Sequence, residues 1–325
     1  MTRISEVTRS RLFLPLLASA ALLFAARAQA IVITTGTWTP IYQGIDYQTA
    51  TVESSQAYAL RVTLSAPGIS FTTTPASGPL ETIAETTSQF LVSSGAQATV
   101  NASFFAPCCA AITQPKSLLG LAVSSGTVVS PYAAGENNAV LLLTAANQAT
   151  ITTINAQPQP ADAFNAVSGS SILVQGGLNV APPTPMTPGA FAGPNPRTDV
   201  GLSQDGQYLY FAAIDGRQPG YSVGATLEEA AELLIGLGAY TALNLDGGGS
   251  TTLALSDGLG GAIVVNRPSG GTERFNGNNI GVFALALPMT VPEPASMMLV
   301  GMGLVGLAIT RRCSGAITDD AMRPN

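Results

Sequence analysis

Short runs of alternating apolar and polar residues, broken by glycines and prolines, fill the chain from residue 31 to about residue 180. This period-two alternation is typical of strands that bury one face. The runs are rich in Thr, Val, Ala and Ser, and the clearest lie at residues 58–64, 98–101, 118–123 and 139–143. The first half of the chain is therefore predicted to form antiparallel sheet.

A proline-dense stretch, residues 181–196, follows and is predicted to be a loop. Beyond it, two apolar runs flank Asp205-Gly206, a dipeptide that strongly favours a hairpin turn. With these two residues as the turn, counting back along both strands places Arg197 opposite Ile214.

A capping box opens the next element, with Thr226 as N-cap and Glu229 three residues later. The apolar positions that follow have helical spacing, and Gly236 and Gly238 end the helix. A buried strand is predicted at residues 240–245. The segment 207–245 thus forms a strand-helix-strand unit whose two strands are expected to run parallel.

A second hairpin is predicted around residues 257–261, where aspartate and glycines separate two apolar runs. Pairing back from this turn brings Asn266 and Arg267 close to Thr251 and Thr252. The folded product is expected to be α+β, with a mixed, largely antiparallel sheet, at least one strand-helix-strand unit and a single domain, because no charge run or long linker divides it.

Both ends of the chain carry export signals. Residues 1–30 have arginines, an apolar run and a small-residue cleavage pattern, which together predict a secretory signal peptide. Pro292-Glu293-Pro294, an apolar stretch to Thr310 and Arg311-Arg312 follow one another near the other end. A plain membrane anchor is one interpretation of this order, although the apolar stretch is short for a membrane span.

The same order resembles the PEP-CTERM sorting signal. The resemblance implies that the protein is exported to the cell surface or extracellular matrix of a Gram-negative bacterium. Signal peptidase and an exosortase are the expected processing enzymes, and the apolar segment is expected to associate transiently with the inner membrane. The expected boundaries are a signal peptide at 1–30, a domain at 31–288, the sorting signal at 289–312 and a short tail at 313–325.

Charge and composition exclude several classes of function. Residues 31–287 contain six basic residues and fifteen acidic ones, which argues against nucleic acid as a partner. The whole sequence contains no histidine, so Ser-His-Asp triads and histidine-ligated zinc are excluded. Any catalytic acid or base is then a carboxylate, a tyrosine, the single lysine or water.

Charged residues converge on one edge of the predicted sheet. Arg197 lies at the start of one strand, Asp215 and Arg217 follow a second, and residues 246–250, with Arg267 nearby, follow a third. Arginine binds phosphate through a planar fork of donors, and the triple glycine after Asp246 allows backbone amides to approach an anion. This edge is therefore predicted to bind an anionic ligand, with Asp246 and Asp215 as candidate acid, base or nucleophile.

The adjacent cysteines Cys108 and Cys109 could form a disulfide or stay reduced in an oxidising compartment. Two adjacent thiols without histidine make a poor metal site, so we assign them a structural role. No cofactor and no metal are predicted.

Six blocks of sequence resemble, in order, those of the phosphodiester glycosidase family. They are Asn101-Ala102-Ser103-Phe104-Phe105, Pro196-Arg197-Thr198, Asp215-Gly216-Arg217, Thr226-Leu227, Asn244-Leu245-Asp246-Gly247-Gly248-Gly249-Ser250 and Asn266-Arg267-Pro268. The resemblance implies hydrolysis of a glycosyl 1-phosphodiester in a phosphorylated glycan. The implied sugar is N-acetylglucosamine, or a sugar of an exopolysaccharide or cell-envelope glycan.

The site roles that follow are hypotheses. Asp246 activates water or stabilises the oxocarbenium-like centre, Arg197 and Arg267 bind the phosphate, and Asn101 and Asp215 orient sugar hydroxyls. The further predicted substrate-binding residues are Thr198, Arg217, Asn244, Gly247, Gly248, Gly249, Ser250 and Arg274. Two alternatives stay open at this point: a non-enzymatic polysaccharide-binding surface or matrix protein, and a metal-dependent phosphodiesterase that cuts the phosphorus-oxygen bond.

Overall fold

The structure, a computed structural model, describes residues 30–109, 112–132, 137–155, 161–183 and 193–288. Met1–Ile31 form a separate unit of which only the last two residues are described, and the compact unit that carries all the sheets begins at Val32. The predicted sorting signal and tail lie outside the described residues, as does nearly all of the predicted signal peptide.

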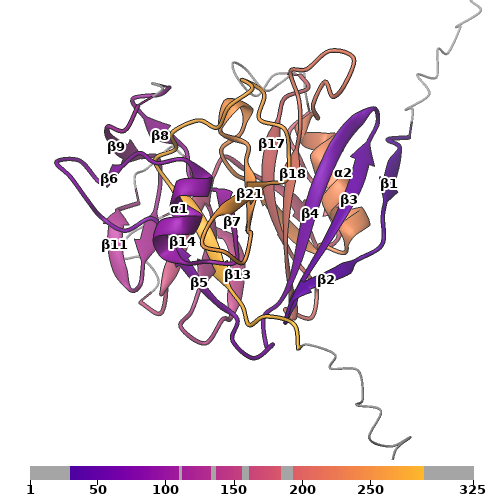
Figure 1. Cartoon of the computed structure of the whole chain (residues 1–325). Helices are drawn as coiled ribbons and strands as arrows, with labels where there is room; N and C mark the ends of the chain where they lie inside the picture. Colours follow the sequence, from indigo (N-terminus) through magenta and orange to yellow (C-terminus); the bar gives the residue numbers. More distant parts are fainter. Residues whose placement is uncertain (1–29, 110–111, 133–136, 156–160, 184–192, 289–325) are drawn as a thin grey trace, which may run out of the picture. The chain divides into compact units, whose positions relative to one another are not determined.

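A nine-stranded sheet forms one side of the compact unit (Figure 1). Its strand order is β1-β3-β4-β18-β17-β19-β15-β16, with β2 paired to β3. The strands are β1 (Ile33–Thr35), β2 (Thr39–Tyr42), β3 (Ile45–Val52), β4 (Ser55–Thr63), β15 (Ser171–Gln175), β16 (Leu178–Asn179), β17 (Arg197–Leu202), β18 (Tyr208–Ile214) and β19 (Thr241–Asn244).

Two five-stranded sheets and one three-stranded sheet complete the strands of the described residues. The first has the order β21 (Ala262–Val264), β20 (Leu253–Ser256), β7 (Ala98–Asn101), β22 (Asn279–Phe283), β5 (Ser70–Thr73). The second has the order β11 (Thr127–Ser130), β10 (Ala122–Ser124), β14 (Asn165–Gly169), β12 (Ala139–Leu143), β13 (Ala149–Thr153). The small sheet joins β6 (Thr82–Ile83), β9 (Pro115–Leu118) and β8 (Phe105–Ala106).

The main core lies between these sheets. Alternate residues of the nine-stranded sheet, such as Leu60, Leu209 and Phe211, pack against Val100 and Leu141 from the two five-stranded sheets. All five side chains are almost wholly buried. Burial of one face of each sheet explains why the period-two pattern in the sequence identified the strands.

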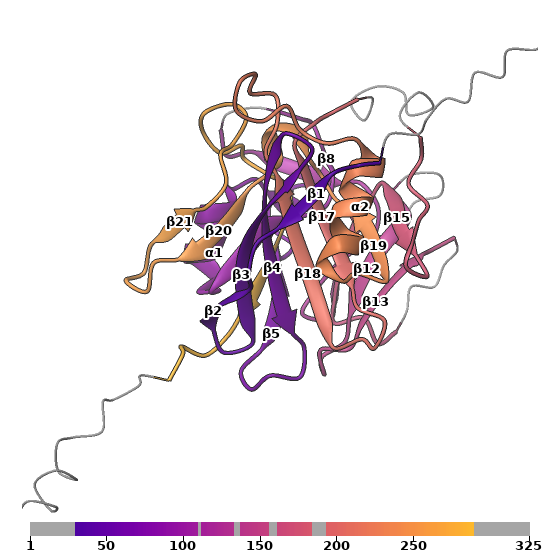
Figure 2. The same cartoon turned by 90° about the vertical axis from the view of Figure 1, so that its right-hand side faces the viewer.

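Two α-helices cover the outer faces of the sheets. Helix α2 (Leu227–Leu237) lies across the nine-stranded sheet, and α1 (Thr87–Ser94) packs against β7 and β20 (Figures 1 and 2). The capping box predicted for α2 is present in full, and Gly238 is its left-handed C-cap. In the part of the chain that is described, neither helix is both long and apolar enough to cross a membrane.

The largely antiparallel sheet and the strand-helix-strand unit are confirmed, with one correction. Strands β18 and β19 run in the same direction, as predicted, but β17 lies between them and pairs antiparallel with both. Every strand pairing of the described residues is antiparallel, so the sheet is not mixed. The fold is strongly dominated by strands.

Two further details differ from the sequence analysis. The predicted strand at 118–123 is divided, because Gly120 has a φ of 95° and turns the chain between β9 and β10. Helix α1 was missed, since it is short and lies within a region of strand-like composition. It too begins with a capping box, made by Thr86 and Gln89.

Both predicted hairpin registers are confirmed. Arg197 pairs with Ile214 at one end of the β17–β18 hairpin. In the second hairpin Ala254 pairs with Val264, and the Asn266 side chain bonds the backbone of both Thr251 and Leu253. The start of β17 and the ends of β18 and β19 therefore meet at one edge of the nine-stranded sheet.

Candidate active site

A cavity of about 420 Å³ opens at this edge. Its volume falls within the range of about 300 to 1,000 Å³ that is typical of small-molecule sites. The charged residues that line it are Arg197, Arg217, Arg274 and Asp246. Three positive charges against one negative charge favour an anionic ligand.

Two guanidinium groups lie directly against the glycine loop after β19. A Cβ atom at Gly248 would lie 3.1 Å from a guanidinium nitrogen of Arg217, and one at Gly249 would collide with the guanidinium of Arg274. Gly248 also has a φ of 64°. The triple glycine therefore does more than turn the chain between two strands. Because it has no side chains, it leaves the space that both arginines occupy.

Arg217 is held in place by its backbone and by Asn195. Its Nε and one of its terminal nitrogens donate to Oδ1 of Asn195, at 3.1 and 2.9 Å. Its φ of 58° places it in the left-handed region, which costs a non-glycine residue about 1 to 2 kcal/mol. Such strain is common where a side chain must be aimed at a ligand.

Arg274 reaches the loop from the segment before β22. Its NH1 donates to the Ser250 hydroxyl at 3.3 Å. The neighbouring Glu273 accepts hydrogen bonds from the backbone N–H and the hydroxyl of Ser88, in the first turn of α1. Glu273 therefore anchors the arginine to the start of a helix, where a negative charge is favoured.

Asp246 is braced from behind by the end of β7. Its backbone N–H donates to the carbonyl of Ala102 at 2.8 Å, and its own carbonyl accepts from the Asn101 amide at 2.6 Å. Burial raises the pKa of the Asp246 carboxyl to about 6, although a hydrogen bond from Ser250, the charge of Arg274 and the N–H of Gly247 oppose the shift. A carboxyl tuned in this way near neutral pH is typical of a catalytic group.

A second acidic group, Asp199, lies beside the site but does not line the cavity. It is fully buried on β17, two residues after Arg197 and hence on the same face of the strand. Neither carboxylate oxygen has a hydrogen-bond partner among the described residues, and burial raises the pKa of Asp199 to about 7 against the opposing charge of Arg197. The sequence analysis missed Asp199. The signal that could have found it is its position two residues after Arg197, on the same face of the same strand.

The sequence profile described as phosphodiester glycosidase matches residues 94–283, more than half of the chain. The chain belongs to the phosphodiester glycosidase family. A second profile, the PEP-CTERM protein-sorting motif, matches residues 290–312. That motif indicates exosortase processing and export of this glycosidase to the cell envelope of a Gram-negative bacterium.

Solved structures share the fold of this glycosidase at low identity. A hypothetical protein from Synechocystis aligns with a TM-score of 0.57 and 18% identity over 78% of this chain and 68% of its own. The catalytic domain of zebrafish N-acetylglucosamine-1-phosphodiester alpha-N-acetylglucosaminidase, auto-inhibited by its pro-peptide, aligns with a TM-score of 0.54 and 15% identity over 79% and 88%. A putative exported protein from Burkholderia pseudomallei gives 0.51 and 18% over 72% and 76%. No curated protein sequence matches the chain.

Seven of the predicted residues of the glycosidase line the cavity, and six do not. The seven are Arg197, Arg217, Asn244, Asp246, Gly247, Gly248 and Arg274. The other six are Asn101, Thr198, Asp215, Gly249, Ser250 and Arg267. Gly249 and Ser250 still contact Arg274.

Asn101 and Thr198 form one buried network behind Asp246. The Thr198 hydroxyl donates to Oδ1 of Asn101 at 2.7 Å, and the same oxygen accepts from the backbone N–H of Thr252 at 3.0 Å. Since the Asn101 amide holds the backbone of Asp246, this geometry favours a positioning role over the predicted contact with sugar hydroxyls.

Asp215 and Arg267 interact with each other away from the cavity. The Asp215 carboxylate accepts from the backbone N–H of Arg267, the Asn266 amide and the Tyr221 hydroxyl. The Arg267 guanidinium lies over the Tyr221 ring, 5.0 Å from its centre. The catalytic role of Asp215 and the phosphate-binding role of Arg267 remain predictions that this geometry does not favour.

Replacing Asp215 with asparagine should therefore lower stability more than catalysis. The new amide group would face donors, and leaving a buried donor unsatisfied costs about 1 to 3 kcal/mol. Urea unfolding would measure the loss. Asp162→Asn, at an exposed turn position before β14, is the matched control and should change stability by no more than about 0.5 kcal/mol. An Asp215→Asn variant of native stability that has lost turnover would restore the catalytic hypothesis.

The sequence analysis missed the apolar wall of the cavity. This wall is formed by Phe104, Phe105, Cys108, Cys109 and Leu119. The aromatic pair was visible in the first family block, but nothing local showed that the cysteines lie near Asp246. Within the described residues no group of three or more Cys, Asp or Glu side chains is arranged to hold a metal ion.

Proposed function

We propose that this glycosidase hydrolyses the bond between the anomeric carbon and the oxygen of a sugar 1-phosphodiester. The observation that supports this most strongly is the lining of the cavity, where Arg217 and Arg274 flank Asp246 on the glycine loop. The substrate class is an N-acetylglucosamine 1-phosphodiester or a similarly linked exopolysaccharide or cell-envelope glycan. The domain that performs the reaction is residues 31–288, since β1 already belongs to the nine-stranded sheet.

The arginines bind the phosphodiester and stabilise the departing phosphate. The Arg217 guanidinium repels those of Arg197 and Arg274. Its charge contributes to lowering the pKa of both, after burial as the main cause. This repulsion is relieved when an anion binds. Guanidinium forks make short, charge-assisted hydrogen bonds to phosphate oxygens.

The absence of histidine from the sequence is consistent with this chemistry. A phosphomonoester is a weak base whose second pKa is about 6, so it leaves a sugar more readily than an alkoxide does. Arginines that hold the departing oxygens can therefore replace most of the work of a general acid. Asp246 then activates water or stabilises the positive charge that develops at the anomeric carbon.

The bond that is cut distinguishes this proposal from its alternatives. The purified protein would be incubated with N-acetylglucosamine-1-phospho-methyl-mannoside, and with related sugar phosphodiesters, in oxygen-18 water, and the label located by mass spectrometry. Label in the released sugar is the expected result. Label in the phosphate would indicate a phosphodiesterase, and no turnover on any of them would favour a polysaccharide-binding protein.

The value of kcat/KM should also rise, not fall, as the pH increases. Asp246 has a pKa of about 6 and must be ionised to act as a base or to stabilise positive charge. Hence kcat/KM should rise with pH through about 6 and level off above it. The Asp199→Asn variant should keep this rise, since Asp199, with a pKa of about 7, lies outside the cavity. A rate that falls above pH 6 would make Asp246 a general acid instead.

A further inference from the structure

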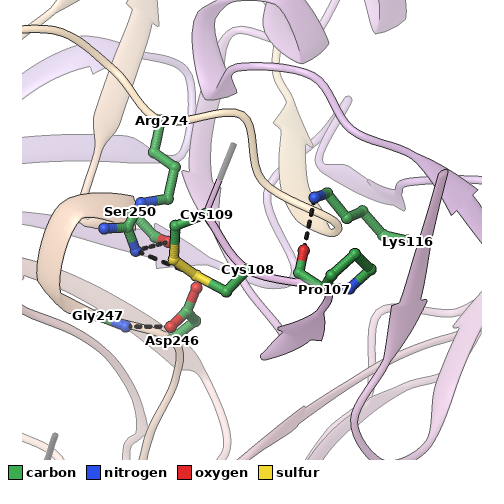
Figure 3. The surroundings of a disulfide bond; sticks show 8 residues. All are labelled: Pro107, Cys108, Cys109, Lys116, Asp246, Gly247, Ser250 and Arg274. Atoms are coloured by element: carbon green, nitrogen blue, oxygen red, sulfur yellow. Dashed lines mark hydrogen bonds between the residues drawn. A yellow bond between two sulfur atoms is a disulfide. The ribbon is translucent and has the colours of Figure 1, made fainter. Parts of the chain in front are cut away.

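The adjacent cysteines lie in the cavity rather than in the framework of the fold. Cys108 and Cys109 are joined by a disulfide and line the cavity just after β8 and Pro107 (Figure 3). This placement was not expected from the sequence, which assigned them a structural role. The bridge spans adjacent residues, so it closes no long loop of the unfolded chain and offers little of the usual stabilisation of a disulfide.

The segment that carries the disulfide is fixed from behind by Lys116. This lysine is fully buried on β9, and its ammonium donates to the Pro107 carbonyl at 2.6 Å and lies 5.3 Å from the centre of the Phe105 ring. The only ion pair among the described residues is Arg61 with Asp46, so Lys116 has no carboxylate partner there. Burying an ammonium in this way is unfavourable for folding, yet it sets the position of the disulfide.

The disulfide faces the groups proposed to act on the substrate. NH1 of Arg274 lies 3.9 Å from the Cys108 sulfur, and the Asp246 side chain extends toward the bridge (Figure 3). A ligand that lies over Asp246 is therefore placed next to the sulfur atoms, since both groups line the same cavity. Under the proposed function that part is the sugar ring, because Asp246 acts at the anomeric carbon.

The chemistry of this wall matches a sugar ring and not a phosphate. Sulfur is soft and polarisable, and a disulfide has no hydrogen-bond donor. Phe104, Phe105 and Leu119 extend the same apolar lining. A pyranose ring presents a face of C–H groups that gains from such contact, whereas an anionic phosphate would lose hydration without compensation.

We propose that the Cys108–Cys109 disulfide is the platform on which the C–H face of the sugar ring rests while its anomeric carbon lies over Asp246. The bridge is then a specificity-determining element, which makes affinity for the sugar, but not for phosphate, dependent on the oxidised state of the two cysteines. This inference rests on the proposed function, and it adds a sugar subsite to the phosphate subsite formed by the arginines.

The test compares two probes, N-acetylglucosamine 1-phosphate and inorganic phosphate, by titration calorimetry of the full chain. In the Cys108→Ser/Cys109→Ser variant the affinity for the sugar phosphate should fall about tenfold, the loss expected for removal of a small apolar contact, while that for phosphate changes less than twofold. Reducing the wild-type protein should have the same effect, and reoxidation should reverse it.

The double variant is also the control for the reductant, because it keeps Cys313 but lacks the bridge, and it should not respond. Unchanged affinities for both probes would overturn the inference. A parallel loss for both probes would overturn it too, since the bridge would then act only by holding Arg274. If the wild-type protein turns over the phosphodiester but shows either result, the proposed function stands and only the platform fails. If the wild-type protein neither turns over the phosphodiester nor binds either probe, the proposed function itself fails, and the platform with it.

Discussion

Replacing Asp246 with asparagine is expected to lower kcat by about 10² to 10⁴-fold, the range associated with loss of a positioned acid or base. Asparagine keeps the size of the side chain, so the contacts of the backbone with Ala102 and Asn101 should survive. It also removes a carboxylate that burial disfavours, so the melting temperature should not fall. Steady-state kinetics and thermal unfolding measure the two effects.

The affinity for phosphate distinguishes an Asp246→Asn variant that has lost only catalysis from one whose binding site is damaged. Asp246→Asn should bind inorganic phosphate as tightly as the wild type or more tightly, because a negative charge beside Arg274 is removed. The matched control is Asp205→Asn, at the exposed turn between β17 and β18, which should leave both kcat and phosphate affinity unchanged. An Asp246→Asn enzyme within twofold of the wild-type rate would show that another group carries the reaction.

Gly249→Ala should lower kcat/KM by about 10² to 10³-fold, as removal of one donor to a developing oxyanion does. The backbone of Gly249 does not have a positive φ, so alanine adds no backbone strain, but its Cβ would collide with the Arg274 guanidinium. Since the far end of a flexible side chain gives way first, the arginine should move while the fold remains. The control is Gly270→Ala, whose Cβ would come no closer than 3.8 Å to any residue beyond its two chain neighbours.

A double-mutant cycle shows whether the alanine acts through the arginine. Arg274→Gln alone should cause a similar loss, and Gly249→Ala combined with Arg274→Gln should be little worse than either alone. Losses that multiply would mean that Gly249 matters for another reason, such as the approach of its backbone to the phosphate.

The position of Arg274 shows why the site could be predicted only in part. Arg267 and Arg274 are equally visible in the sequence, and Arg267 was assigned to the phosphate because hairpin register placed it at the right edge. Register locates a backbone position but not the direction of a long side chain. In the fold, Arg267 turns to the Tyr221 ring, whereas Glu273 and the start of α1 direct Arg274 into the cavity.

The sequence by itself determined the features that depend on neighbours close along the chain. Strand periodicity, the Asp-Gly turn that set Arg197 opposite Ile214, and the capping box at Thr226 each rest on contacts within a few residues, and each was confirmed. The glycine block after Asp246 likewise identified the family.

Only the tertiary structure decided what faces the cavity. The place of β17 between β18 and β19, the burial of Asp199 and the position of the Cys108–Cys109 disulfide beside Asp246 all depend on packing between segments far apart in the sequence. Such packing follows from burying all the apolar faces at once, and no local pattern records its outcome.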